Sequence, residues 1–268
     1  MSWLQALQIP MIRQAFVGLI LAGSLLSLWG VMVISLNLTG LRFTLMHVGL
    51  LGAAVGMALD MSPTVGAFAL ILLVSGVMGV LGDRVRLSTN ALSGFFMTGS
   101  LAVAFILLAK SGIPAMEVFG IFAGSVLLLS TMDLVFVIVL GIVTVLFYTI
   151  LYREIQLVLL DKELAAILGV PVGKIRLVMF ILLGAAVALA LRLVGALLVD
   201  AVILLPAMAA LPLANGLKMA LVLTAFFGLL SASGGFFLAL SLDLPVGASV
   251  AVTGAFILAL SYVKQRRI

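Results

Sequence analysis

The sequence predicts an all-α polytopic membrane protein with eight to nine transmembrane helices, and three observations carry that prediction. Mean hydropathy is +1.46 and only 9% of the residues are charged, which excludes an ordinary water-soluble domain. Apolar runs of about 18 residues or more recur along the chain, as membrane-spanning helices require. The alternating pattern of membrane β-strands is absent. We therefore expect one transmembrane domain over residues 1–268.

In chain order we expect nine spans, all predominantly apolar: 14–36, 41–60, 63–82, 90–109, 132–151, 175–193, 194–211, 218–241 and 246–263. The first run has no basic segment before it and no small-residue cleavage site, so we expect a retained helix and not a signal peptide. Asp200 and Pro206 interrupt the seventh span. Residues 117–129 are too short to cross and are expected at the interface or as a re-entrant segment.

The distribution of basic residues predicts the orientation. With the amino terminus outside and the carboxyl terminus in the cytoplasm, all Lys and Arg except Arg13, Lys110 and Arg192 lie at or near the cytoplasmic side. The opposite orientation would place most of them outside. The net charge of +5 is thus explained by membrane topology, and no nucleic acid partner is expected.

Between the spans, the most polar stretch is Tyr152–Arg176, with seven charged residues. Within it, Asp161 can cap a short helix that places Leu164, Ile167 and Leu168 on one face. Gly169 and Pro171 can then end that helix. A short, firmly ended amphipathic helix on a cytoplasmic loop is a suitable handle for another protein. The alternative is an ordinary loop without a coupling role.

Several kinds of chemistry are excluded by what the sequence lacks. Without cysteine there are no disulfides and no thiolate ligands. No GxxxxGK[ST] phosphate loop occurs, so nucleotide hydrolysis of that type would take place on another chain. An intramembrane enzyme ranks last among the candidates, because there is no His-Glu-x-x-His pair and no thiol nucleophile. We expect neither an enzyme nor a permanently bound cofactor.

Three segments resemble the zinc/manganese permease family of ABC transporters. They are DKELAAILGVPVGKIRLVMFILLGAAVALALRLVGALLVDAVILLPAMAA (161–210), SASGGFFLALSLDLPVGASVAV (231–252) and MHVGLLGAAVGMALDMSP (46–63), the last with the single His47. The resemblance implies a permease in a bacterial cytoplasmic (inner) membrane. It also implies a second copy of the chain, cytoplasmic ABC ATPase subunits that hydrolyse ATP, and an extracytoplasmic solute-binding protein that delivers the metal. Residues 152–176 would be the coupling loop, with Asp161, Glu163 and Gly169 in the acidic and glycine positions of the coupling helix.

One departure from the family pattern concerns the cargo. The family has an aspartate one helical turn before the histidine, whereas this chain has Phe43, with Arg42 beside it. His47 alone would be a poor cation site, and Arg42 would repel a cation unless it snorkels to the cytoplasmic surface. Asp200 is the candidate that compensates, although it is expected about a turn and a half away from His47 in depth.

Alternatives remain open for these residues. Asp200 could serve a successive position on a metal path, or could pair with Arg192 as a purely structural ion pair. His47 could simply be hydrogen-bonded within the bundle. We expect turn or capping roles for Asp60 and Asp243, and a helix-start role for Asp133.

The leading hypothesis is the membrane subunit of an ATP-driven importer for a divalent transition metal, with zinc or manganese first and iron as a further candidate. A metal chelate or another small solute on the same scaffold is an alternative cargo. An ion-gradient-driven secondary transporter is the alternative from a different class. It would be expected to have more paired intramembrane carboxylates than one Asp and one His.

Overall fold

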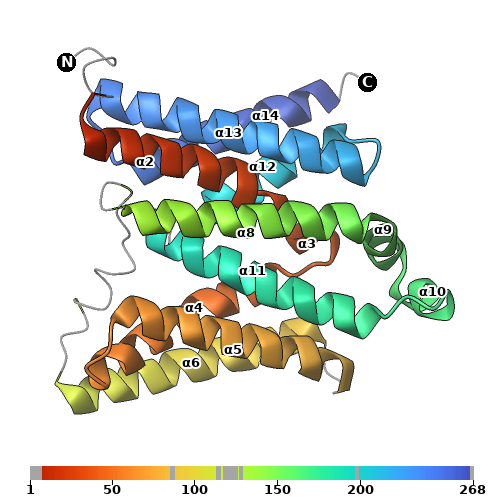
Figure 1. Ribbon diagram of the computed structural model, residues 1–268, viewed down its shortest axis with the longest axis horizontal. Helices are drawn as coiled ribbons and strands as arrows, with labels where there is room; N and C mark the ends of the chain where they lie inside the picture. Colours follow the sequence, from red (N-terminus) through yellow and green to blue (C-terminus); the bar gives the residue numbers. More distant parts are fainter. Residues whose placement is uncertain are drawn as a thin grey trace. The chain divides into compact units, whose positions relative to one another are not determined.

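The computed structural model describes residues 8–84, 88–112, 129–196 and 199–265, together with Met116 and Val126. Within these ranges every regular element is a helix (Figure 1). The helices are α2 (Pro10–Leu21), η1 (Ala22–Leu26), α3 (Leu28–Ser35), α4 (Thr39–Ala58), α5 (Pro63–Arg84), α6 (Thr89–Ser111), α8 (Thr131–Ile150), α9 (Tyr152–Leu160), α10 (Lys162–Ile167), α11 (Val172–Val194), α12 (Val199–Ala210), η4 (Leu211–Leu213), α13 (Leu217–Leu242) and α14 (Val246–Gln265).

In the described ranges, eight helical stretches are long and apolar enough to cross a membrane. The first runs from Pro10 to Ser35 through α2, the π-helical turn η1 and α3. The all-helical prediction is confirmed, and the predicted spans other than the seventh correspond to these eight stretches. The interface or re-entrant prediction for 117–129 falls almost wholly outside the described residues.

Local sequence signals account for the helix ends. Ser88 caps α6, because its side chain accepts a hydrogen bond from the backbone N–H of Ala91. Asp60 and Asp243 adopt left-handed backbone conformations, with φ of 55° and 52°, directly after helices. The turn role predicted for both is confirmed, since aspartate tolerates this region better than most residues.

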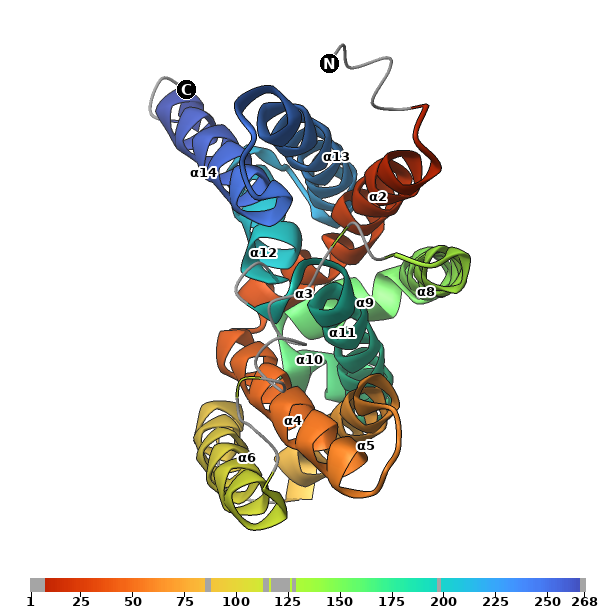
Figure 2. The ribbon, with the colours of Figure 1, turned by 90° about the vertical axis from the view of Figure 1, so that its left-hand side faces the viewer.

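The chain divides into two compact units. Unit 1 comprises residues 1–34, 124–145 and 189–268, and unit 2 comprises residues 35–123 and 146–188. In unit 2, α4 packs against both α5 and α6 (Figure 2). Gly52 and Gly56 make the first of these contacts close, because a Cβ at either would lie against the backbone of α5 near Gly66.

In unit 1, side-chain contacts establish the direction of each helix. Gln14 bonds Thr131 and Trp29 bonds Thr144, so the first span and α8 run parallel. On the other side of that span, α13 runs antiparallel. Phe16 stacks on Phe236, with ring centroids 4.9 Å apart, and the hydroxyl of Ser27 donates to the carbonyl of Thr224.

These directions define the path of the short helix α12. Arg192, near the end of α11, contacts Asp133 at the start of α8. The contacts of α13 place its beginning near the opposite end of the first span, beside α3. The chain must therefore return across unit 1 through α12 and η4, which supply 12 and three residues.

At about 1.5 and 2.0 Å per residue, α12 and η4 cover roughly 24 Å, which is less than a full membrane helix. The predicted seventh span, 194–211, thus needs correction. It is a buried short helix inside unit 1 and not a span of ordinary length. Its close approach to α3 depends on Gly30, where a Cβ would collide with the carbonyl oxygen of Ile203.

Candidate functional site

A pocket of about 750 Å³ lies in unit 2 between the first halves of α4 and α6. It is lined by Asn37, Thr39, Gly40, Phe43, His47, Asn90, Ser93, Gly94 and Met97. The two helices are tied together beside it by a hydrogen bond of 2.8 Å from the Thr44 hydroxyl to the carbonyl of Ser93. Because Thr44 is fully buried, this bond stabilises the spacing of the two helices.

His47 lies on the wall of this pocket and is half-buried. Its Nδ1 is 2.8 Å from the backbone carbonyl oxygen of Phe43, one turn earlier in α4. A carbonyl oxygen can only accept, so Nδ1 carries the proton in this contact. In the neutral ring, Nε2 then keeps its lone pair as an acceptor or metal ligand. The expected intrabundle hydrogen bond is thus present, and it leaves one nitrogen of the ring for a ligand.

Phe43 occupies the position of the missing carboxylate and is 43% exposed. It forms part of the pocket wall. Arg42, by contrast, is 0% exposed within the chain, so the structure does not show the snorkelling that would keep its charge away from a cation at His47. Its guanidinium carbon lies 4.2 Å from the centre of the Phe43 ring, and Nη1 lies 3.3 Å from Met46 Sδ. The aromatic face and the thioether are two favourable contacts of this buried guanidinium.

The other polar lining groups are neutral. Asn37 and Asn90 contribute amides, Thr39 and Ser93 contribute hydroxyls, and Met97 contributes a thioether. Within the described part of the chain, no carboxylate lines the pocket and no group of three or more His, Cys, Asp or Glu residues could hold a metal ion. The donors present are suited to hydrogen bonding, and only His47 is a usual ligand for a transition metal.

Asp200, the second predicted path residue, lies in the first turn of α12 and is half-buried. A carboxylate there is stabilised by the amino-terminal end of the helix dipole. Asp200 belongs to unit 1 and His47 to unit 2. The structure therefore does not join the two predicted path residues in one described site.

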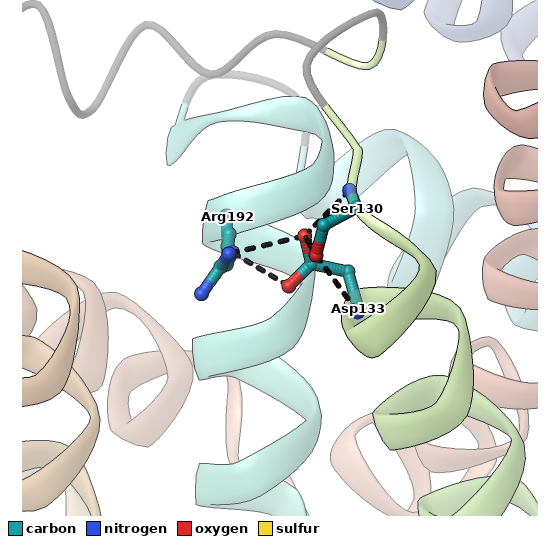
Figure 3. Close-up of polar contacts among 3 residues, drawn as sticks. All are labelled: Ser130, Asp133 and Arg192. Atoms are coloured by element: carbon teal, nitrogen blue, oxygen red, sulfur yellow. Dashed lines mark hydrogen bonds and ion pairs between the residues drawn. The ribbon is translucent and has the colours of Figure 1, made fainter. Parts of the chain in front are cut away.

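The alternative partner predicted for Asp200 is wrong, because Arg192 bonds Asp133 (Figure 3). Arg192 Nε lies 2.7 Å from Asp133 Oδ1, and Nη2 lies 3.1 Å from Oδ2. Asp133 is only 2% exposed, and it also accepts hydrogen bonds from the backbone N–H and hydroxyl of Ser130. The Ser130 hydroxyl in turn accepts from the backbone N–H of Asp133, which forms a reciprocal cap at the start of α8.

The helix-start role predicted for Asp133 is confirmed, but sequence reasoning missed its ion pair. The two residues are 59 positions apart, and nothing in their local patterns links them. A two-pronged contact of this kind joins the start of α8 to the last turn of α11.

The helix predicted within the polar stretch is α10, and its local structure agrees with the prediction. Asp161 Oδ1 accepts hydrogen bonds from the backbone N–H groups of Glu163 and Leu164, at 2.8 and 3.1 Å. Gly169 follows with a φ of 82°, a conformation that favours glycine at a helix end.

The outer face of α10 is apolar. Leu164, Ile167 and Leu168 are 42%, 81% and 59% exposed, and Leu160 at the end of α9 is 80% exposed. We name these four residues the α10 patch. An exposed cluster of large apolar side chains on a loop is typical of a protein contact surface.

Comparison with known proteins places this architecture in context. A model of the family described as "ABC 3 transport family" matches residues 8–265. The manganese transport system membrane protein MntC of Halalkalibacterium halodurans is 26% identical, over 96% of this chain and 88% of the relative. The high-affinity zinc uptake system membrane protein ZnuB of Haemophilus influenzae is 27% identical, over 93% of this chain and 97% of the relative.

Among solved structures, the chain is similar to one described as "PsaBC from Streptococcus pneumoniae in complex with Fab". The TM-score is 0.81 at 23% identity, and the match covers 97% of this chain and 94% of that chain. This similarity supports the helical architecture across nearly the whole chain.

Proposed function

Because the chain belongs to the ABC 3 transport family, we propose that it is the permease subunit of an ATP-driven importer for zinc or manganese. The family match over residues 8–265 is the observation that carries the proposal. The names of the two relatives, a manganese and a zinc transport protein, support a divalent transition metal as cargo. ATP hydrolysis belongs to a separate ATPase chain.

The partner surface for that ATPase is the α10 patch. The short capped helix α10 is bounded by Asp161 and Gly169, so it can move as a rigid body. Closure of a bound ATPase would then be passed through α9 and α11 to the membrane helices. A second copy of the chain completes the permease, and an extracytoplasmic binding protein supplies the cargo.

For the orientation, the amino terminus lies outside and the carboxyl terminus lies in the bacterial cytoplasm. Support comes from unit 1, where α13 runs antiparallel to both the first span and α14. The first and last helices therefore point the same way. This direction requires an odd number of crossings, which results when the return through α12 and η4 is counted with the eight long spans. The basic residues determine which end is cytoplasmic.

On the cargo path, His47 Nε2 offers a ligand inside the pocket of unit 2, and Asp200 offers a carboxylate within unit 1. Metal would pass these groups in succession as the helices open to each side in turn. Neutral imidazole and carboxylate are both ordinary ligands for zinc and manganese.

Coupling is tested on the purified complex with its ATPase and binding protein in proteoliposomes. We expect Asp161→Ala to lower metal uptake per ATP about tenfold through fraying of α10, and Asp161→Asn to retain coupling because asparagine also caps helices. The same measurement on Glu163→Ala tests the neighbouring acidic residue of α10. Glu154→Ala is its control, because it removes one negative charge from α9 instead of α10. Equal uptake per ATP in Asp161→Ala and wild type would show that α10 does not couple.

Path residues are tested in the same assay. His47→Ala and Asp200→Asn should lower metal uptake at least about tenfold while leaving nucleotide-dependent assembly with the ATPase intact. If His47→Ala transports metal at the wild-type rate, the path through the pocket is wrong.

A further inference from the structure

The pocket beside His47 is chemically unlike a site for a bare dication. We propose that it receives the metal as a small carboxylate chelate of near-zero net charge. This inference rests on the proposed function, because it assumes that the chain carries a divalent metal. It names the form in which the cargo enters this pocket.

The first argument is charge. Among the described residues, the nine that line the pocket include one imidazole and no carboxylate, and the buried Arg42 packs against the ring of Phe43, so these groups offer no negative charge to a dication. A dication held against these groups would have no counter-charge among the described lining residues to stabilise it. A ligand that brings its own carboxylates has already neutralised the metal before it enters.

Size is the second argument. A volume of about 750 Å³ far exceeds what a single ion needs. It falls within the range of roughly 300–1,000 Å³ that is usual for small-molecule sites. The exposed ring of Phe43 adds an apolar wall against which the carbon skeleton of a chelator can pack.

Third, the polar groups of the wall match the outside of such a complex. The amides of Asn37 and Asn90 and the hydroxyls of Thr39 and Ser93 can donate hydrogen bonds to carboxylate oxygens. His47 Nε2, left as an acceptor by the Nδ1 contact with Phe43, can take an open coordination position on the metal. A dication with two carboxylates therefore finds hydrogen-bond donors around it, and the buried Arg42 beside Phe43 attracts its carboxylates instead of repelling a bare cation.

The experiment measures uptake by the complete transporter in proteoliposomes, with zinc and carbon-labelled dipicolinate or malate as the probes. The concentrations of the zinc–chelator complex and of free zinc are varied independently by adjusting the excess of chelator. We expect metal and carbon label to accumulate together in near-equal amounts, at a rate that follows the concentration of the complex. A rate that follows free zinc, with the carbon label excluded, would overturn the inference and leave the proposed function standing.

A variant pair connects the result to the pocket. Phe43→Asp supplies a carboxylate one turn from His47, so it should raise uptake from free zinc at least about fivefold and lower uptake of the chelate. Phe43→Leu keeps the wall apolar and adds no charge, so it should not raise uptake from free zinc, and the comparison isolates the effect of the carboxylate. If Phe43→Asp leaves both uptake rates unchanged, the pocket does not select the form of the cargo. If neither zinc nor manganese enters in either form with ATP, the proposed function fails and the inference fails with it.

Discussion

At the scale of single residues, the Asp133–Arg192 pair is the contact within unit 1 whose loss has the clearest cost. Asp133 is nearly buried, and both of its oxygens contact the guanidinium of Arg192. Arg192→Ala would leave a carboxylate with little water around it. The free energy of unfolding should fall by about 2 kcal/mol, between the values for buried and surface pairs, because the Arg192 side chain is 43% exposed.

This prediction is checked by thermal unfolding in detergent, where a loss of that size lowers Tm by roughly 4–8 °C. Arg13→Ala is the matched control, since Arg13 is an exposed arginine on α2. Equal Tm values for the two variants would show that the ion pair contributes nothing to stability.

Single residues also show where reading the sequence succeeds and where it stops. The predicted cap at Asp161 and the predicted turns at Asp60 and Asp243 depend on neighbours a few positions away, so local pattern is sufficient for them. The partner of Arg192 lies 59 positions away in another helix, and local pattern contains no information about it.

At the scale of elements, the contact between α3 and α12 depends on a glycine. A Cβ at Gly30 would collide with the carbonyl of Ile203 and lie 2.7 Å from the Cβ of Ala207. Neither neighbour is a flexible side-chain end, so Gly30→Ala should lower the free energy of unfolding by about 1–3 kcal/mol.

The matched control is Gly99→Ala in α6, where no atom lies within 4 Å of the added Cβ. Alanine there should be neutral or stabilise by up to about 1 kcal/mol, because it favours helix more than glycine does. Tm values of both variants test the prediction. A Gly30→Ala protein as stable as Gly99→Ala would mean that the two helices are not in close contact.

Helix α12 also shows why hydropathy overestimates the length of a buried helix. Hydropathy alone predicts a full span over 194–211, because α11 and α12 are both apolar. The break between them follows Gly195, which has a φ of 80°. Nine residues of α12 are buried, so this helix does not need to match the thickness of the bilayer. Composition cannot separate these two kinds of apolar helix.

At the scale of the whole molecule, the family match and the helix directions within unit 1 agree with a multi-span permease. The fold was largely predictable, because apolar runs and basic loops are strong signals in membrane proteins. The candidate site was less predictable from the sequence than the fold. His47 could be named from sequence, but the neutral amides and hydroxyls around it come from 37–40 and 90–97 and meet only in the folded chain.

The most direct test of the central claim is zinc or manganese uptake into proteoliposomes that contain this chain, with and without its ATPase, binding protein and ATP. We predict accumulation only when all three accompany the permease, and none when ATP is replaced by a non-hydrolysable analogue. Accumulation by the chain alone, driven by an ion gradient, would contradict the assignment and identify a secondary transporter.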